Sequence, residues 1–203
     1  MSGTLRDIGL VLVFILVSSF FVNAEMALVS LRDSQARALQ SRGRRGSIVA
    51  KLNGDPNRFL AAVQVGVTLS GFLSAAFGGV TLAGRLSPKL QQLHMSEGLA
   101  DATALVLITL AISYVSLVVG ELAPKRLALQ RAESISLAVA PTVDRIAKLA
   151  RPVIWLLSVS TDVVVRLVGG DPKAQREQIS DAEIRELVSG SETLGAEERQ
   201  IVE

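Results

Sequence analysis

The stretch from position 59 to position 84 contains 26 residues and not one charged side chain. A helix needs roughly 20 predominantly apolar residues to cross the hydrocarbon core of a bilayer. Two further runs, residues 8–31 and 102–120, are also long enough, and the only charged residue within them is Glu25. Irregular backbone exposed to lipid would leave its polar groups unsatisfied, so each run predicts a transmembrane helix.

Composition excludes several other classes of protein. The chain has no cysteine and a single histidine, His94, which excludes disulfides, thiol catalysis and metal centres built from several Cys or His residues. We find no nucleophile–base pair and no glycine-rich phosphate loop, so we do not expect an enzyme. A cleaved signal peptide is the alternative for the first run, but the run is too long and lacks a basic leader.

These patterns predict an all-α membrane protein with a transmembrane core over residues 1–132 and spans at about 8–31, 59–84 and 100–121. Residues 133–168 are expected to form juxtamembrane helices at the membrane interface. Pro141 and Pro152 should break this region into pieces too short to span. The apolar stretch from 153 to 168 could be a fourth span, but it carries Asp162 and Arg166 on one helical face, which favours an interfacial helix.

The last part of the chain has a different character. From about Gly169 a polar linker containing Gly and Pro leads into an acidic, helix-forming segment, and together they make up residues 169–203. Ser180 precedes Glu183 by three residues, which is the signature of a capping box. The helical pattern stops at Glu203 before it is complete, so we expect cytosolic regulatory domains to follow.

Basic residues predict the orientation in the membrane. Seven lie between the first two runs and two between the second and third: Arg32, Arg37, Arg42, Arg44, Arg45, Lys51 and Arg58 against Arg85 and Lys89. Loops rich in Lys and Arg stay on the cytoplasmic side. We therefore expect a multi-pass protein of the cell membrane, the plasma or inner membrane, with its N-terminus outside and its C-terminus in the cytoplasm.

Polar groups within the spans are the candidate functional residues, because a charge at the bilayer centre costs about 2.5–3.5 kcal/mol. Asn23 in the first run and Glu121 at the end of the third are the strongest candidates. Pro124 should disrupt the third helix near Glu121 and free the carbonyl near Gly120. These groups are all oxygen ligands, which hard cations such as Mg²⁺ prefer. Two alternatives remain: serines often bond to their own helix backbone, and Glu25 could cap the helix or pair with Arg32.

Three motifs carry a family resemblance. They are FFVNAEMALVSL at residues 20–31, QVGVTLSGFLSAAFGG at 64–79 and VVGELAPKRLAL at 118–129. In order and spacing they resemble the FFVAAE-ALVS, Q-x-G-x-T-L and GE-x-x-PK-x-x-A motifs of the CorC/CNNM magnesium transporters. The resemblance covers residue 8 to about residue 132.

That resemblance implies a homodimeric, three-span transporter for Mg²⁺, with export of Mg²⁺ in exchange for Na⁺. It implies an ion held between the spans, and the matching positions give the metal ligands Ser19, Asn23, Gly66, Ser70 and Glu121. The expected partners are membrane lipid, a second copy of the chain and the cytosolic domains. We do not expect binding to nucleic acid. The alternative function is a membrane anchor and dimerisation module for those domains, which would not need polar groups inside the membrane.

Overall fold

The computed structural model describes residues 2–170, and every element in that range is a helix. In chain order these are α1 (Ser2–Val29), α2 (Asp33–Gln40), α3 (Arg44–Asn53), α4 (Pro56–Gln91), α5 (Glu97–Val115), the π-helical η1 (Ser116–Leu122), α6 (Ala123–Gln130), α7 (Ala132–Leu149) and α8 (Arg151–Leu167). The all-α fold is therefore confirmed. The chain divides into two compact units, Met1–Ile154 and Trp155–Glu203, and the candidate site lies in the first.

Three helices are long and apolar enough to span a membrane: Gly3–Val29, Phe59–Gln91 and Glu97–Gln130. The prediction of three spans is confirmed, although the second and third are longer than the apolar runs indicated. At 1.5 Å per residue these helices measure about 40 to 51 Å, against a hydrocarbon core of about 30 Å. They must therefore tilt or extend beyond the core. Arg85 and Lys89, which we placed in a loop, belong to the last turns of α4.

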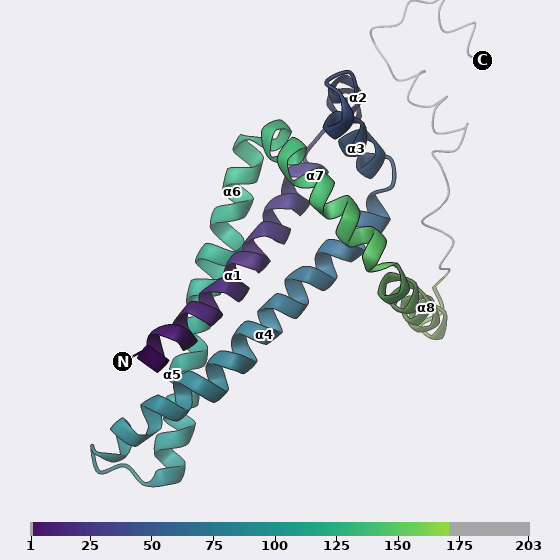
Figure 1. Cartoon of the computed structure of the whole chain (residues 1–203). Coiled ribbons are helices and arrows are strands. Elements are labelled where there is room, and N and C mark those ends of the chain that lie inside the picture. Colours follow the sequence, from purple (N-terminus) through teal and green to yellow (C-terminus); the bar gives the residue numbers. More distant parts are fainter. Residues whose placement is uncertain (1, 171–203) are drawn as a thin grey trace, which may run out of the picture. The chain divides into compact units, whose positions relative to one another are not determined.

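The second and third spans pack against the first span, α1. Helix α4 contacts α1 on one side, and η1 and α6 of the third span contact it on the other (Figure 1). Small residues allow the close approach. A Cβ on Gly66 would lie 2.5 Å from the ring of Phe21, and one on Gly78 would lie 2.1 Å from Ile112. Helices that pack in lipid use such residues because backbone proximity and van der Waals contact replace the hydrophobic drive.

Two separate apolar clusters hold the first unit together. The larger lies where α1, α3, α4 and α7 meet, with the fully buried Leu28, Val49, Phe59 and Val143 at its centre. The smaller joins Val11 and Ile15 of α1 to Ile112 of α5, with Phe77 and other partly buried residues beside it. One cluster thus lies toward each end of α1.

The expected break at Pro124 takes another form. Helix α5 continues through η1 into α6, and the seven π-helical residues immediately precede the turn that contains Pro124. The N–H of Ala123 bonds to the carbonyl of Val118, five residues back, and Pro124 has no N–H to offer the next carbonyl. A widened turn therefore accommodates the proline without ending the helix. Such π-bulges are frequent at functional sites.

The prediction that Pro141 breaks the juxtamembrane region is wrong, because α7 runs through it from Ala132 to Leu149. Proline inside a helix costs about 3 kcal/mol. Here the flanking Val139, Ala140, Val143 and Ala147 are buried, and α7 packs against α1, α3 and α4. This burial on both sides of Pro141 offsets the cost of the proline and keeps the helix whole.

Beyond α7, Ala150 separates α7 from α8, and Pro152 sits in the first turn of α8, where it is tolerated. With 17 residues, α8 is shorter than a typical span. Its interfacial position stays a prediction. The linker from residue 171, the capping box at Ser180 and Glu183, and the acidic segment lie outside the described residues.

Candidate ion site

A cavity of about 430 Å³ opens between the three spans toward the C-terminal end of α1. Helix α1 contributes one face with the helical spacing i, i+3, i+4 and i+7. Helix α4, η1 and α6 supply the remaining walls. The lining residues are Val22, Glu25, Met26, Val29, Gln64, Val67, Glu121 and Lys125. Two carboxylates and one amide from three different spans therefore face the same space.

Glu121 does not stand alone in this cavity. The ammonium of Lys125, one helical turn later, lies 2.5 Å from its carboxylate. The side chains of Glu121 and Lys125 are 46% and 38% exposed in the isolated chain. An exposed pair of this kind contributes only about 0.2–1 kcal/mol. The ammonium can therefore leave Glu121 readily when another cation approaches.

Of the five residues predicted as ligands, only Glu121 lines this cavity. Gly66 faces the ring of Phe21, which gives it a packing role between α1 and α4. Ser70 is buried on the same face of α4, one turn further along, and Ser19 is partly buried on α1. Within the described residues, no cluster of three or more His, Cys, Asp or Glu side chains is present. The five ligands are not shown to meet at one point.

Asn23 occupies a special position at the edge of this arrangement. It follows the cavity residue Val22 on α1, and its Oδ1 is buried without a hydrogen-bond partner among the described residues. The Oγ of Ser74 on α4 is in the same situation. Buried polar atoms normally have a partner, because leaving one unsatisfied costs about 1–3 kcal/mol. Asn23 therefore has an unused oxygen in the packed interior, one residue after the cavity residue Val22.

The opposite end of the bundle has a different character. Val11 and Ile15 of α1 pack with Ile112 of α5 beside a cavity of about 200 Å³, and the rings of Phe14 and Phe77 meet edge to face with 6.4 Å between their centroids. Further out, Arg85 lies 2.5 Å from the carboxylate of the buried Asp7, bonds to Thr4 and lines a cavity of about 550 Å³. No carboxylate lines either of these two cavities, in contrast to the cavity that holds Glu25 and Glu121.

The arrangement suits a hard cation. Mg²⁺ takes near-octahedral oxygen coordination and usually keeps several of its waters. A water occupies about 30 Å³ of liquid, so six need roughly 180 Å³, and the cavity of about 430 Å³ exceeds this volume. Carboxylates from Glu25 and Glu121, with the amide oxygen of Gln64, offer a hydrated cation three oxygen groups.

Three polar residues that line the cavity were not among the predicted ligands. Glu25 had several interpretations, and Gln64 opens the second motif but was not assigned to the ion. Lys125 could have been found from its spacing, because residues four apart on a helix are neighbours and an acid followed by a lysine at that distance commonly pairs.

Comparison with known proteins gives a consistent assignment. The sequence model described as the Cyclin M transmembrane N-terminal domain, CNNM, matches residues 9–200. The chain is 38% identical over 190 residues to the UPF0053 protein sll0260 of Synechocystis, which covers 93% of this chain and 42% of that protein. It is 34% identical over 183 residues to the UPF0053 protein YrkA of Bacillus subtilis, covering 89% and 42%.

A more distant relative is the uncharacterized protein Rv1841c of Mycobacterium tuberculosis, 30% identical over 196 residues that cover 94% of this chain and 55% of that protein. The chain therefore spans about two fifths to just over half of the curated relatives it matches. The matched family model covers nearly all of the chain, including most of the first span, the other two spans and every residue that lines the candidate cavity. The chain belongs to the CorC/CNNM family and matches its transmembrane N-terminal domain.

Proposed function

We propose that this domain carries Mg²⁺ across the cell membrane, exporting it in exchange for Na⁺. The observation that supports this most is the cavity in which Glu25, Gln64 and Glu121 from three separate spans face one space. A membrane anchor has no use for two carboxylates at such a position, since polar groups inside a membrane are costly and usually belong to a transport path. Family membership supports the choice of Mg²⁺.

The proposed cycle begins with the cavity open to the cytoplasm. In the orientation predicted from the basic residues, the end of α1 that leads into α2 is cytoplasmic, so Mg²⁺ enters there with part of its water. It displaces the ammonium of Lys125 from Glu121. Lys125 is then the tethered cation that neutralises Glu121 when no cargo is bound, which limits the cost of an unpaired carboxylate.

Release on the other side requires a path through the opposite end of the bundle. The ion would pass the buried oxygens of Asn23 and Ser74, which have no partner in the described structure. The Val11–Ile15–Ile112 packing and the Asp7–Arg85 pair would then separate. Rocking of one helix group against another is the usual way in which midplane sites alternate between the two faces. In this cycle the continuous helix α5–η1–α6 would move relative to α1 and α4.

A homodimer is part of the proposal. Large apolar side chains of α5, among them Leu105, Leu107 and Leu110, are exposed in a single chain. Lipid or a second copy must cover them. Light scattering of the detergent-solubilised protein should give a protein mass of about twice 21.5 kDa. A mass equal to a single chain would remove the dimer from the proposal.

The function is tested by Mg²⁺ flux into and out of proteoliposomes that contain the purified chain. We expect flux that depends on an opposed Na⁺ gradient and reverses when that gradient is reversed. Glu121→Gln should abolish it, whereas Glu97→Gln, an exposed residue in the first turn of α5, should not. Flux without Na⁺ dependence would remove the coupling, and no flux in the intact chain would leave the anchor function.

A further inference from the structure

A second cavity lies away from the ion site, between α3 and α7. It measures about 290 Å³, and four of its seven lining residues are cations. The lining residues are Arg44, Arg45, Ile48, Pro141, Asp144, Arg145 and Lys148. The only acid among them, Asp144, is already shared by Lys148 at 2.6 Å and Lys51 at 3.5 Å. The cavity therefore presents an excess of positive charge.

The neighbouring acids do not reduce this excess. In α2, α3 and α7 the acidic residues are Asp33, Glu133 and Asp144. Asp33 accepts a hydrogen bond from Asn53, and Glu133 pairs with Arg42 at 3.4 Å. Within residues 2–170, no carboxylate lies within ion-pair distance of Arg44, Arg45 or Arg145. Three guanidinium groups thus converge on a cavity with no anion of the described chain to neutralise them.

Helix α3 reinforces the positive field. It begins at Arg44, and no side chain caps its N-terminus, since the N-cap residue is Gly43. The free N–H groups of a first helical turn and the helix dipole favour an anion there. Guanidinium groups bind phosphate oxygens in a bidentate manner. Phosphate is therefore the chemistry that this cavity fits best.

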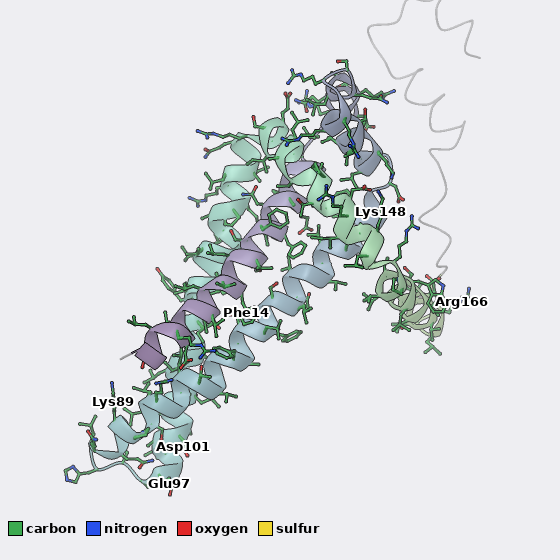
Figure 2. All side chains as sticks on the ribbon, viewed as in Figure 1. Phe14, Lys89, Glu97, Asp101, Lys148 and Arg166 are labelled. Atoms are coloured by element: carbon green, nitrogen blue, oxygen red, sulfur yellow. The ribbon has the colours of Figure 1, made fainter. Side chains whose placement is uncertain are left out.

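The place of the cavity in the fold indicates which phosphate-containing molecule could reach it. Helix α3 lies between the end of α1 and the start of α4, and α7 packs against both of those spans. Figure 2 shows Lys148 near that end of the spans, and Lys89, Glu97 and Asp101 near the other. At the end of a membrane span, lipid headgroups are the phosphates present at the highest local concentration, and basic pockets there bind acidic lipids.

We propose that the cavity between α3 and α7 binds the phosphate of an anionic phospholipid headgroup. Arg44, Arg45 and Arg145 hold the phosphate oxygens. Asp144 fixes Lys148 at the rim, and the apolar Ile48 and Pro141 contact the glycerol part of the headgroup. A lipid bound there would tie α3 to α7, and through α7 to α1 and α4. It is a site separate from the ion cavity, and its occupancy does not depend on the identity of the transported ion.

The test is a titration of the intact chain in neutral detergent, followed by native mass spectrometry. The probes are dioleoyl phosphatidylglycerol, the matching phosphatidylcholine, and inorganic phosphate. We expect at least tenfold tighter binding of phosphatidylglycerol than of phosphatidylcholine. The double variant Arg44→Gln with Arg145→Gln should weaken phosphatidylglycerol binding at least fivefold. The control Arg37→Gln with Arg131→Gln removes the same charge from exposed positions outside the cavity and should change it less than twofold.

Each measurement tests one part of the proposal. An equal loss in both double variants would mean general attraction to a basic surface and would overturn the site. Binding of inorganic phosphate as tight as that of phosphatidylglycerol would overturn the lipid as its source. Equal affinity for the two lipids would overturn the selection for negative charge. Circular dichroism checks that the variants fold, and Arg145→Lys with Arg44→Lys, which keeps the charge, should restore most of the binding if the loss reflects the site.

Discussion

At the scale of single residues, the contact between Glu121 and Lys125 decides how the ion cavity behaves. In the proposed cycle the Glu121 carboxylate binds the cation, and the ammonium of Lys125, which lies 2.5 Å away, competes for the same carboxylate. Because both groups are partly exposed, the pair is weak and a divalent ion can replace the ammonium. Two substitutions at this pair should therefore have opposite effects on Mg²⁺ affinity.

Glu121→Gln is expected to weaken Mg²⁺ binding at least tenfold, or about 1.4 kcal/mol. The amide keeps the shape of the side chain but removes one of the two carboxylates in the cavity. Titration calorimetry on the purified chain measures the change, with Glu97→Gln as the control. Unchanged affinity would assign Glu121 a purely structural role.

Lys125→Met is expected to tighten Mg²⁺ binding by about 1.4- to 5-fold, because the ion no longer has to displace a competing charge worth about 0.2–1 kcal/mol. Methionine keeps the length and the apolar stem of the side chain. Lys125→Arg retains the charge and should bind Mg²⁺ as the parent chain does. If Lys125→Met binds Mg²⁺ more weakly, then Lys125 supports the site rather than competing for it.

Asp144 allows a prediction about pH. The hydrogen bond from Lys148, with the charge of Lys51, holds the pKa of this carboxyl below its ordinary value of 3.8. A lowered pKa in the folded state means that the ionised group stabilises the fold above the unfolded pKa, and that this stability is lost as pH falls through the folded pKa. Asp144→Asn should lower the melting temperature at pH 7 and reduce its decline below pH 4. Thermal unfolding between pH 3 and pH 7 measures both, and parallel curves would contradict this role.

At the scale of helices, packing through small residues holds α4 against α1. Gly66, Ser70, Ser74 and Gly78 recur every fourth residue and so lie along one face of α4. Gly66 meets Phe21 and Gly78 meets Ile112, while Ser70 and Ser74 are buried between them. Gly66 therefore allows close contact between α4 and α1, and this packing role is independent of the predicted role of its carbonyl as a metal ligand.

Gly66→Ala should therefore destabilise the chain by about 1–3 kcal/mol, the usual cost of overpacking, since its Cβ would meet the Phe21 ring at 2.5 Å. Gly71→Ala has no atom within 4 Å of the new Cβ and should be neutral or stabilising. Melting temperatures in detergent give the comparison. Adding Phe21→Leu to Gly66→Ala should recover part of the loss, and no recovery would place the strain elsewhere.

The helices also show what the sequence could predict. Long apolar runs with at most one charged residue predicted three spans, because length and apolarity alone meet the physical requirement of a bilayer. The ends of the spans were harder to predict from the sequence. Arg85 lies in α4 because it reaches Asp7 and Thr4, a contact with α1 that no local pattern reveals. Pro141 lies inside α7 for a similar reason, since burial on both sides compensates for its missing hydrogen bond.

The site was predicted only in part, for a reason of helix geometry. Polarity and the motif identified Glu121, which lines the cavity. Which other side chains join it depends on how each helix is rotated about its axis. Consecutive residues differ by 100°, so Glu25 faces the cavity while Asn23, two positions earlier, faces the packed interior. That rotation follows from tertiary contacts such as Gly66 against Phe21.

At the scale of the whole molecule, the first unit is asymmetric along its spans. One end carries the cavity lined by Glu25 and Glu121, the basic α3 and the packed α7. The other end carries the Val11–Ile15–Ile112 cluster and the Asp7–Arg85 pair, beside cavities that no carboxylate lines. Orientation decides which of the two ends faces the cytoplasm, and the proposed cycle requires that it is the end with the two carboxylates.

Orientation can be measured with single cysteines, because the chain has none of its own. Ser41 lies exposed in the turn between α2 and α3, and Ser96 lies exposed before α5. Seven basic residues near Ser41 predict that it is cytoplasmic. Near Ser96 the only basic residues are Arg85 and Lys89, and Arg85 is paired with Asp7. Glu97 and Asp101 add negative charge there, so the net positive charge on this side is low. In intact cells an impermeant maleimide should label Ser96→Cys at once and Ser41→Cys only after permeabilisation. The reverse pattern would turn the cavity outward and invert the predicted orientation, and labelling of both in intact cells would contradict a three-span topology.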